Sequence, residues 1–244
     1  MLSTRPMTID ERANQLTCER PAPGVVVFQP RGGYHYVQNP ILLVGFCLEN
    51  ERPLSFVDVG TGPGIMAFLL ARQGVPGLGI DIRPEWIELA RSSNDYNQLS
   101  VVFREADART FRPRRTYDLA VINPPYHPPE APRSSDPLVA QCTHQLAGTL
   151  ADLVGAAASW SRRVGVVIPT SADEHVAQTL AEHARPVARW VRLEGGLSLL
   201  EGRAGGRCRG VEVLPWRRGD AWSEPVQRWC ERAGVTAARA ASAP

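Results

Sequence analysis

The 244-residue sequence contains no lysine, and all 27 of its basic residues are arginine. The formal net charge of +2 is too small to indicate a nucleic-acid partner by itself. A composition that favours Arg, Ala, Gly and Pro explains the bias, although guanidinium groups also pair bidentately with phosphate. A polyanionic partner is therefore permitted but not demonstrated. The arginines cluster at Arg112, Arg114 and Arg115; Arg162 and Arg163; Arg203, Arg207 and Arg209; and Arg217 and Arg218.

Paired cysteine motifs are also missing. The five cysteines are odd in number, and no two form a C-x-x-C pair. This spacing favours free thiols in a reducing compartment and gives little support to a structural zinc site. The five histidines are equally dispersed, so we expect no metal centre. The residues concerned are Cys18, Cys47, Cys142, Cys208 and Cys230, and His35, His127, His144, His175 and His183.

No apolar run approaches the roughly 20 residues that a membrane span requires. Met1 to Arg12 lacks the apolar centre of a signal peptide, so we expect a cytoplasmic protein without a membrane partner. The length suits one domain with one substantial core. We predict a flexible arm over residues 1–23, a single domain over 24–217 and a partly disordered C-terminal extension over 218–244. A short helix within that extension is predicted at Glu224–Arg232.

The chain is organised around the stretch from Phe56 to Ile65, where an apolar run ends in Asp58 and is followed by Gly60, Gly62 and Gly64. Such a turn lets the backbone approach a ligand with no side chain between them. The G-x-G-x-G spacing differs from the G-x-G-x-x-G of dinucleotide folds, and the acid disfavours a pyrophosphate. The pattern therefore predicts a cofactor without phosphate, such as an amino-acid-bearing adenosine sulfonium.

From residue 55 onward, strand patterns alternate with helical ones. Alternation of this kind predicts an α/β fold with a parallel sheet, right-handed crossovers and helices on both faces. A closing strand pair, joined by a hairpin at Gly205 and Gly206, is predicted after the last helix. The predicted strands are Ser55–Val59, Leu78–Ile82, Val101–Arg104, Tyr117–Ile122, Val164–Pro169, Val187–Leu193 and Val211–Leu214, preceded by a β segment at Gly24–Phe28. The predicted helices are Ile41–Cys47, Ile65–Gln73, Pro84–Asn94, Leu138–Trp160 and Ser171–Ala184.

Four candidate site residues fall at the carboxyl ends of predicted strands. They are Gly60, Asp81, Asp107 and Asn123. Ligands of open α/β sheets bind outside these ends, so the four stretches should converge on one rim. Asp58 can face the ammonium end of the cofactor, and Asp81 can accept hydrogen bonds from its ribose hydroxyls.

The second informative stretch is Asn123-Pro124-Pro125-Tyr126, directly after a predicted strand. Two prolines can simply end a strand, but this position lies where the reactive group of the cofactor would be presented. A planar amide or aromatic amine is a poor nucleophile because its lone pair is delocalised. The Asn123 side-chain oxygen and the Pro124 carbonyl can accept its two N–H groups, and Tyr126 can stack on the flat acceptor.

These motifs resemble those of class I S-adenosylmethionine (SAM) methyltransferases. Asn123 to Tyr126 resembles motif IV of the amino-methyltransferases, whose acceptors are adenine N6, cytosine N4, guanine N2 or a glutamine amide. The resemblance implies a Rossmann-like, seven-stranded, mostly parallel sheet with an antiparallel last strand. It also implies that SAM binds at Asp58, Gly60, Gly62, Gly64 and Asp81, with Asp107 near the adenine.

The segment upstream narrows the choice of family. Phe28-Gln29-Pro30, Gly33-Tyr34 and Ile41-Leu42-Leu43 resemble the motif of bacterial enzymes that N6-methylate an adenine beside the anticodon of valine tRNA. The resemblance implies a tRNA partner, catalytic roles for Asn123, Pro124 and Tyr126, and acceptor contacts from Tyr34, Pro125, Tyr126 and His127. The chain departs from that family's pattern at His35, Asn39 and Val139–Gln145.

Other acceptors remain open at this point. They are a guanine N2 of rRNA, a DNA base, a protein glutamine N5 or a small molecule, and a SAM-binding protein without turnover is a further alternative. The glutamine methyltransferases of release factors share N-P-P-Y, but they usually carry a separate N-terminal helical domain. Only about 50 residues precede the glycine turn here, which favours the tRNA alternative.

Overall fold

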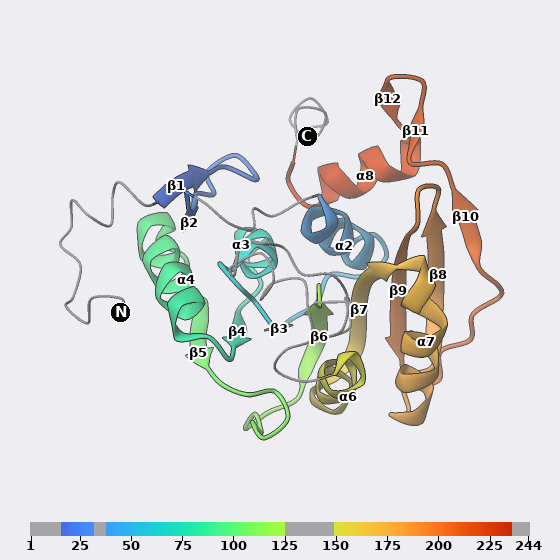
Figure 1. Ribbon diagram of the computed structural model, residues 1–244, viewed down its shortest axis with the longest axis horizontal. Coiled ribbons are helices and arrows are strands. Elements are labelled where there is room, and N and C mark those ends of the chain that lie inside the picture. Colours follow the sequence, from blue (N-terminus) through green and yellow to red (C-terminus); the bar gives the residue numbers. More distant parts are fainter. Residues whose placement is uncertain (1–15, 32–37, 125–148, 236–244) are drawn as a thin grey trace, which may run out of the picture.

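The computed structural model describes residues 16–31, 38–124 and 149–235. An eight-stranded sheet crosses the molecule in the order β10-β8-β9-β7-β6-β3-β4-β5 (Figure 1). Neighbouring strands are parallel except that β9 is antiparallel to β7 and β8, so the predicted α/β class is confirmed. The strands are β3 (Phe56–Val59), β4 (Gly77–Asp81), β5 (Val102–Glu105), β6 (Tyr117–Ile122), β7 (Ser161–Pro169), β8 (Val187–Leu193), β9 (Leu197–Arg203) and β10 (Glu212–Leu214).

Two predictions about the end of the sheet are wrong. The sheet has eight strands rather than seven, because β9 lies between β7 and β8 and the short β10 adds an edge. The closing hairpin joins β8 to β9 rather than β8 to β10, and it turns at Gly195 and Gly196, both with positive φ, instead of at Gly205 and Gly206. The first six residues of β9 are all buried, so it lacks the polar–apolar alternation by which a half-exposed strand is recognised.

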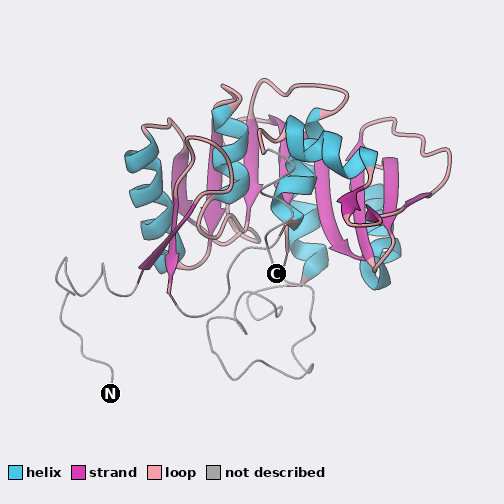
Figure 2. Cartoon of the chain, turned by 90° about the horizontal axis from the view of Figure 1, so that it is seen from above, coloured by secondary structure: helices cyan, strands magenta, loops and turns pink. Residues whose placement is uncertain are grey.

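Helices cover both faces of the sheet, as predicted (Figure 1). One face carries α2 (Asn39–Leu48), α3 (Ile65–Arg72), α4 (Pro84–Asn97) and α8 (Glu224–Arg232), and the other carries α6 (Leu150–Trp160) and α7 (Asp173–Glu182). A short 3-10 turn, η1 (Thr170–Ala172), precedes α7. Figure 2, turned by 90°, shows the strands side by side behind helices. Residues 138–148 of the predicted long helix lie outside the described residues.

Two apolar clusters, one on each face, hold these layers together. Phe56 contributes to the cluster under α2 and α3, whereas Val57 contributes to the cluster under α6. Both residues are completely buried, which explains the continuous apolar run of β3. The next residue along, Asp58, points to the same face as Phe56 and α3. A buried carboxylate is therefore built into an otherwise apolar strand.

Segments from both ends of the sequence pack on the α3 face. The hairpin of β1 (Leu16–Glu19) and β2 (Val27–Pro30) is held to α4, because the Phe28 N–H donates to Ser93 Oγ (2.9 Å) and the Val26 N–H donates to Asn97 Oδ1 (2.8 Å). Four residues of the predicted flexible arm thus form a strand. The helix predicted at Glu224–Arg232 is confirmed as α8, after a small hairpin of β11 (Arg217–Arg218) and β12 (Ala221–Trp222).

The contact between α8 and α2 is very close. A Cβ on Gly45 of α2 would lie 1.8 Å from the Trp229 carbonyl oxygen of α8. The indole N–H of Trp229 donates to Glu49 Oε2 (3.1 Å), and its ring meets Phe46 edge-on. The helix therefore belongs to the packed core. Within the described residues, no helix is both long and apolar enough to cross a membrane.

Candidate active site

The glycine turn after β3 is fixed to the neighbouring strand. The backbone N–H groups of Gly60 and Thr61 both donate to the Ile80 carbonyl of β4, at 2.9 and 2.8 Å. Gly60, Gly62 and Gly64 have φ angles of 73°, 53° and 94°, which L side chains rarely adopt. The three glycines predicted for this turn therefore match its backbone conformation.

The three glycines differ in what surrounds them. A Cβ on Gly64 would meet the rings of Phe68 and Phe103 at 2.8 and 3.1 Å, so this glycine is required by packing. A Cβ on Gly60 or Gly62 would find no atom of the described residues within 4 Å. The first two glycines thus line open space at the carboxyl end of β3, where a ligand can lie against the backbone.

Asp58 is completely buried beneath this turn. Its Oδ2 accepts hydrogen bonds from Thr61 Oγ1 (2.7 Å) and the Ala67 N–H (3.2 Å), whereas its Oδ1 is buried without a partner among the described residues. Burial raises the pKa of this carboxyl from 3.8 to about 7, partly offset by those two hydrogen bonds. A cationic donor beside Oδ1 would complete the site and favour the ionised form.

Asp81 ends β4 and is 3% exposed. It accepts four hydrogen bonds: Oδ1 from the Arg83 N–H (3.1 Å) and Arg83 Nε (3.0 Å), and Oδ2 from the Gly62 N–H (3.0 Å) and Arg83 Nη2 (3.3 Å). The acid thus ties the glycine turn to the start of α4. Sequence reasoning singled out Asp81 but missed Arg83, although the D-x-R spacing was visible.

Asp107 repeats this arrangement beyond β5. Its carboxylate accepts from the Arg109 N–H (2.9 Å), from Nε (3.0 Å to each oxygen) and from Nη2 (2.6 Å). The side-chain hydrogen bonds from Arg109 lower the pKa of the Asp107 carboxyl. The segment is placed beside Asp81, because the Ala106 N–H donates to the Asp81 carbonyl (2.9 Å).

Ile82 is a second residue that sequence reasoning missed as part of the site. It follows Asp81 directly, yet 37% of its surface is exposed, whereas every residue of β4 is buried. A large apolar side chain exposed at the strand end offers a flat adenine ring a contact surface. Its position after a predicted strand-end acid was a signal that could have identified it.

Asn123 and Pro124 follow β6, which pairs with β3 on the side away from β4. Asp58 is the register partner of Val121, so Asn123 comes level with Gly60 two residues further along both strands. Asn123 is half-buried and Pro124 is buried. Gly60, Asp81, Asp107 and Asn123 thus meet at one rim, as predicted. Tyr34, Pro125, Tyr126 and His127 lie outside the described residues.

The described donors and acceptors fit SAM. The unpaired Asp58 Oδ1 suits its ammonium group, two acids at neighbouring strand ends suit hydroxyl and amino donors, and the open space at Gly60 and Gly62 suits close backbone contact. Among the described residues, no three His, Cys, Asp or Glu side chains are grouped to hold a metal ion.

Comparisons with known proteins agree with this geometry. Residues 56–146 match the family model described as methyltransferase domain. The structure resembles that of a protein from Agrobacterium tumefaciens described as a predicted O-methyltransferase, with a TM-score of 0.59 and 15% identity over 81% of this chain and 97% of that one. The chain has the class I methyltransferase fold. SAM is the cofactor of that fold.

Two further similarities involve proteins whose methyl acceptors are named. The 16S rRNA N2 methyltransferase of T. thermophilus, solved with AdoMet and guanosine, has a TM-score of 0.56 and 17% identity over 78% of this chain and 50% of that one. The release factor glutamine methyltransferase of Streptococcus pneumoniae is 35% identical over 79 residues, which are 31% of this chain and 28% of that protein. This chain spans less than half the length of the curated relatives that it matches.

Proposed function

We propose that this protein is a SAM-dependent N-methyltransferase that acts on a planar exocyclic nitrogen, adenine N6 in tRNA. The observation that carries the proposal is the position of Asn123-Pro124 at the end of β6, level with Gly60 and beside the Asp58 turn. With Asn123 level with Gly60, its side-chain oxygen and the Pro124 carbonyl would supply two acceptors beside the open space at the glycine turn. Such acceptors suit a nitrogen that carries two hydrogens.

The residues of the rim promote methyl transfer by positioning the acceptor nitrogen and the cofactor. When bound, SAM supplies an electrophilic methyl group on a positively charged sulfur. The Asn123 side-chain oxygen and the Pro124 carbonyl accept the two N–H groups of the acceptor, which directs the nitrogen lone pair toward that methyl group. No base has to remove a proton before the in-line attack, so the rate depends on orientation and local electrostatics.

On the cofactor side of the rim, each residue is assigned a different part of SAM. Asp58 receives the ammonium group at its unpaired Oδ1, and Asp81 receives the ribose hydroxyls. Asp107 lies near the adenine amino group, and Ile82 packs on the adenine ring. Burial of Asp58 and Asp81 keeps their hydrogen bonds away from competing water, which strengthens them.

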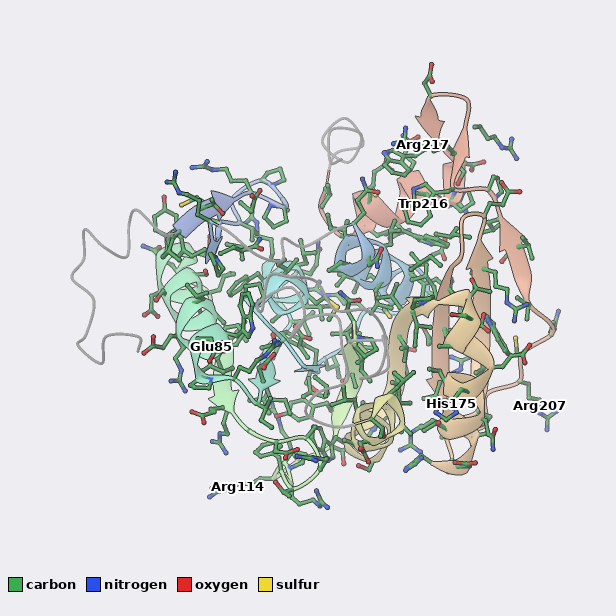
Figure 3. All side chains as sticks on the ribbon, in the orientation of Figure 1. Glu85, Arg114, His175, Arg207, Trp216 and Arg217 are labelled. Carbon is green, nitrogen blue, oxygen red and sulfur yellow. The ribbon has the colours of Figure 1, made fainter. Side chains whose placement is uncertain are left out.

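A nucleic-acid acceptor is supported by the upstream resemblance to tRNA adenine methyltransferases and by the fold shared with an rRNA methyltransferase. The arginine clusters do not form one patch. Arg114, Arg207 and Arg217 project from well separated parts of the periphery (Figure 3). Such a distribution suits a long polyanion that contacts several sites better than a mononucleotide.

A glutamine side-chain amide in a protein is the second candidate. The local identity with the release factor glutamine methyltransferase favours it, and the chemistry at Asn123 would be the same. An amide nitrogen is planar and carries two hydrogens, as an adenine amino group does. The two candidates therefore differ in the polymer that reaches the rim.

The test is transfer of labelled methyl from SAM to total RNA and total protein from cells that lack this gene, followed by nucleoside and amino-acid analysis. We expect N6-methyladenosine in tRNA. Label in N5-methylglutamine would select the second candidate. Cofactor binding without transfer to either polymer, unchanged by Asn123→Ala, would instead indicate a SAM-binding protein without turnover.

A further inference from the structure

Asp81 has no lone pair left for a ligand. A carboxylate offers about four lone-pair sites, and Asp81 already accepts four hydrogen bonds, three from Arg83 and one from the Gly62 N–H. The side chain is also 3% exposed, so water does not supply or remove these bonds freely. Two ribose hydroxyls therefore reach Asp81 only if two of the present donors leave.

The donors that can leave are those of the Arg83 guanidinium. The Gly62 N–H belongs to the turn that Gly60 and Thr61 fix to β4, and the Arg83 N–H belongs to the residue that caps α4. The guanidinium, in contrast, is 24% exposed and ends a chain of rotatable bonds. It contributes two bonds, through Nε (3.0 Å) and Nη2 (3.3 Å), and the ribose would contribute two in their place.

We infer that the Arg83 guanidinium and the ribose of SAM compete for Asp81, and that this competition sets the affinity for the cofactor. The inference rests on the proposed function, because it takes Asp81 as the ribose ligand. A neutral diol replaces a cation at a buried carboxylate, so the wild-type affinity is lower than Asp81 alone would give. Arg83 acts here as a positioning residue rather than a catalytic one.

In its present position the Arg83 guanidinium also lies over an aromatic ring. Its Cζ lies 5.5 Å from the centroid of the Trp86 ring on the first turn of α4, within the range of a cation–π interaction. Trp86 is 2% exposed and remains in place when Arg83 moves. We expect the exchange to proceed by rotation of the Arg83 side chain.

Asp107 and Arg109 provide an internal comparison. Their four contacts are as complete as those of Asp81, but the two side chains are 23% and 47% exposed. Solvent screens an exposed ion pair, so less is lost when a ligand separates it. Competition by Arg109 for the adenine site is accordingly weaker than competition by Arg83 for the ribose site.

The test measures binding of S-adenosylhomocysteine to the full chain by calorimetry. Arg83→Met removes the donors and keeps the apolar stem, so we expect a dissociation constant about 10-fold lower than that of the wild type. The thermal midpoint without ligand should fall, because Asp81 loses its counter-ion. If Arg83 were only structural, its removal would destabilise the fold without tightening the binding of S-adenosylhomocysteine.

Two variants serve as controls. Arg162→Met removes an arginine that is 78% exposed and 4.0 Å from Asp118, and it should change neither quantity. Arg109→Met should tighten binding less than Arg83→Met does. Arg83→Gln keeps one donor group, so it should tighten binding to an intermediate degree. It takes the place of Arg83→Met if the methionine variant does not fold.

The outcomes separate the two proposals. If the wild type binds S-adenosylhomocysteine but Arg83→Met or the folded Arg83→Gln binds it equally or more weakly, the competition is refuted and the proposed function stands. If the wild type does not bind S-adenosylhomocysteine at all, the proposed function is refuted at its cofactor.

Discussion

The cofactor half and the acceptor half of the rim differ in how far hydrogen bonds hold their side chains in place. On the cofactor half, Asp58 and Asp81 are held by hydrogen bonds from the glycine turn and from α3 and α4 before any ligand is present. On the acceptor half, Asn123 stands half-buried at the end of β6, and Pro124 follows it. We propose that cofactor affinity depends on the first half and turnover on the second. The predictions below test that separation.

The largest effect is expected on the acceptor half. Asn123→Ala removes one of two acceptors that orient the nitrogen, so kcat should fall about 100-fold or more while the SAM dissociation constant stays within about 2-fold. Asp81→Ala should do the reverse and weaken SAM binding first. Steady-state kinetics and calorimetry on both variants measure the split. A large loss of SAM binding in Asn123→Ala would contradict the separation.

A smaller effect, dependent on pH, is expected at Asp58. Burial raises the pKa of its carboxyl to about 7, so the folded protein holds this proton between about pH 4 and 7. The stability contributed by the protonated form is therefore lost as pH rises through this range. The cofactor's ammonium group favours the ionised form, so SAM should bind roughly 20-fold more tightly at pH 7.5 than at pH 5.5, with release of about one proton at pH 5.5 and about a quarter of a proton at pH 7.5.

Calorimetry in buffers of different ionisation enthalpy counts the released proton directly. Asp58→Asn cannot ionise and should flatten the pH dependence, while its circular dichroism shows whether the fold is kept. Binding that stays equally strong at pH 5.5 in the wild type would mean that the ammonium group lies elsewhere.

The sequence predicted the strand limits and the strand-end acids better than it predicted the pairing of individual side chains. The limits of β6 and β8 were predicted to the residue, and the strand-end acids were placed correctly because alternating strands and helices leave few topologies. The Arg83–Asp81 pairing and the unpaired oxygen of Asp58 depend on side-chain conformations that spacing does not encode. The buried strand β9 was missed because it lacks alternation.

The smallest effects are expected within the glycine turn, where packing and ligand contact can be separated. Gly64→Ala should destabilise the fold by about 2–3 kcal/mol, because its Cβ meets Phe68 and Phe103, and the thermal midpoint should fall by roughly 5–10 °C. Gly62→Ala places its Cβ in open space, so it should cost about 1 kcal/mol of stability but weaken SAM binding about 5-fold. Thermal melts and calorimetry on the pair measure both quantities. Equal losses of affinity would show that the open space does not face the cofactor.

The close contact of Gly45 with Trp229 has a consequence for how the chain folds as it is synthesised. The α2 helix is synthesised some 180 residues before α8, which covers it, because the Glu49–Trp229 hydrogen bond spans 180 positions. The apolar surface around Phe46 therefore stays uncovered until the whole sheet has been made. We expect the nascent chain to expose this apolar surface during synthesis, and the packing of α2 to be completed when α8 docks on it.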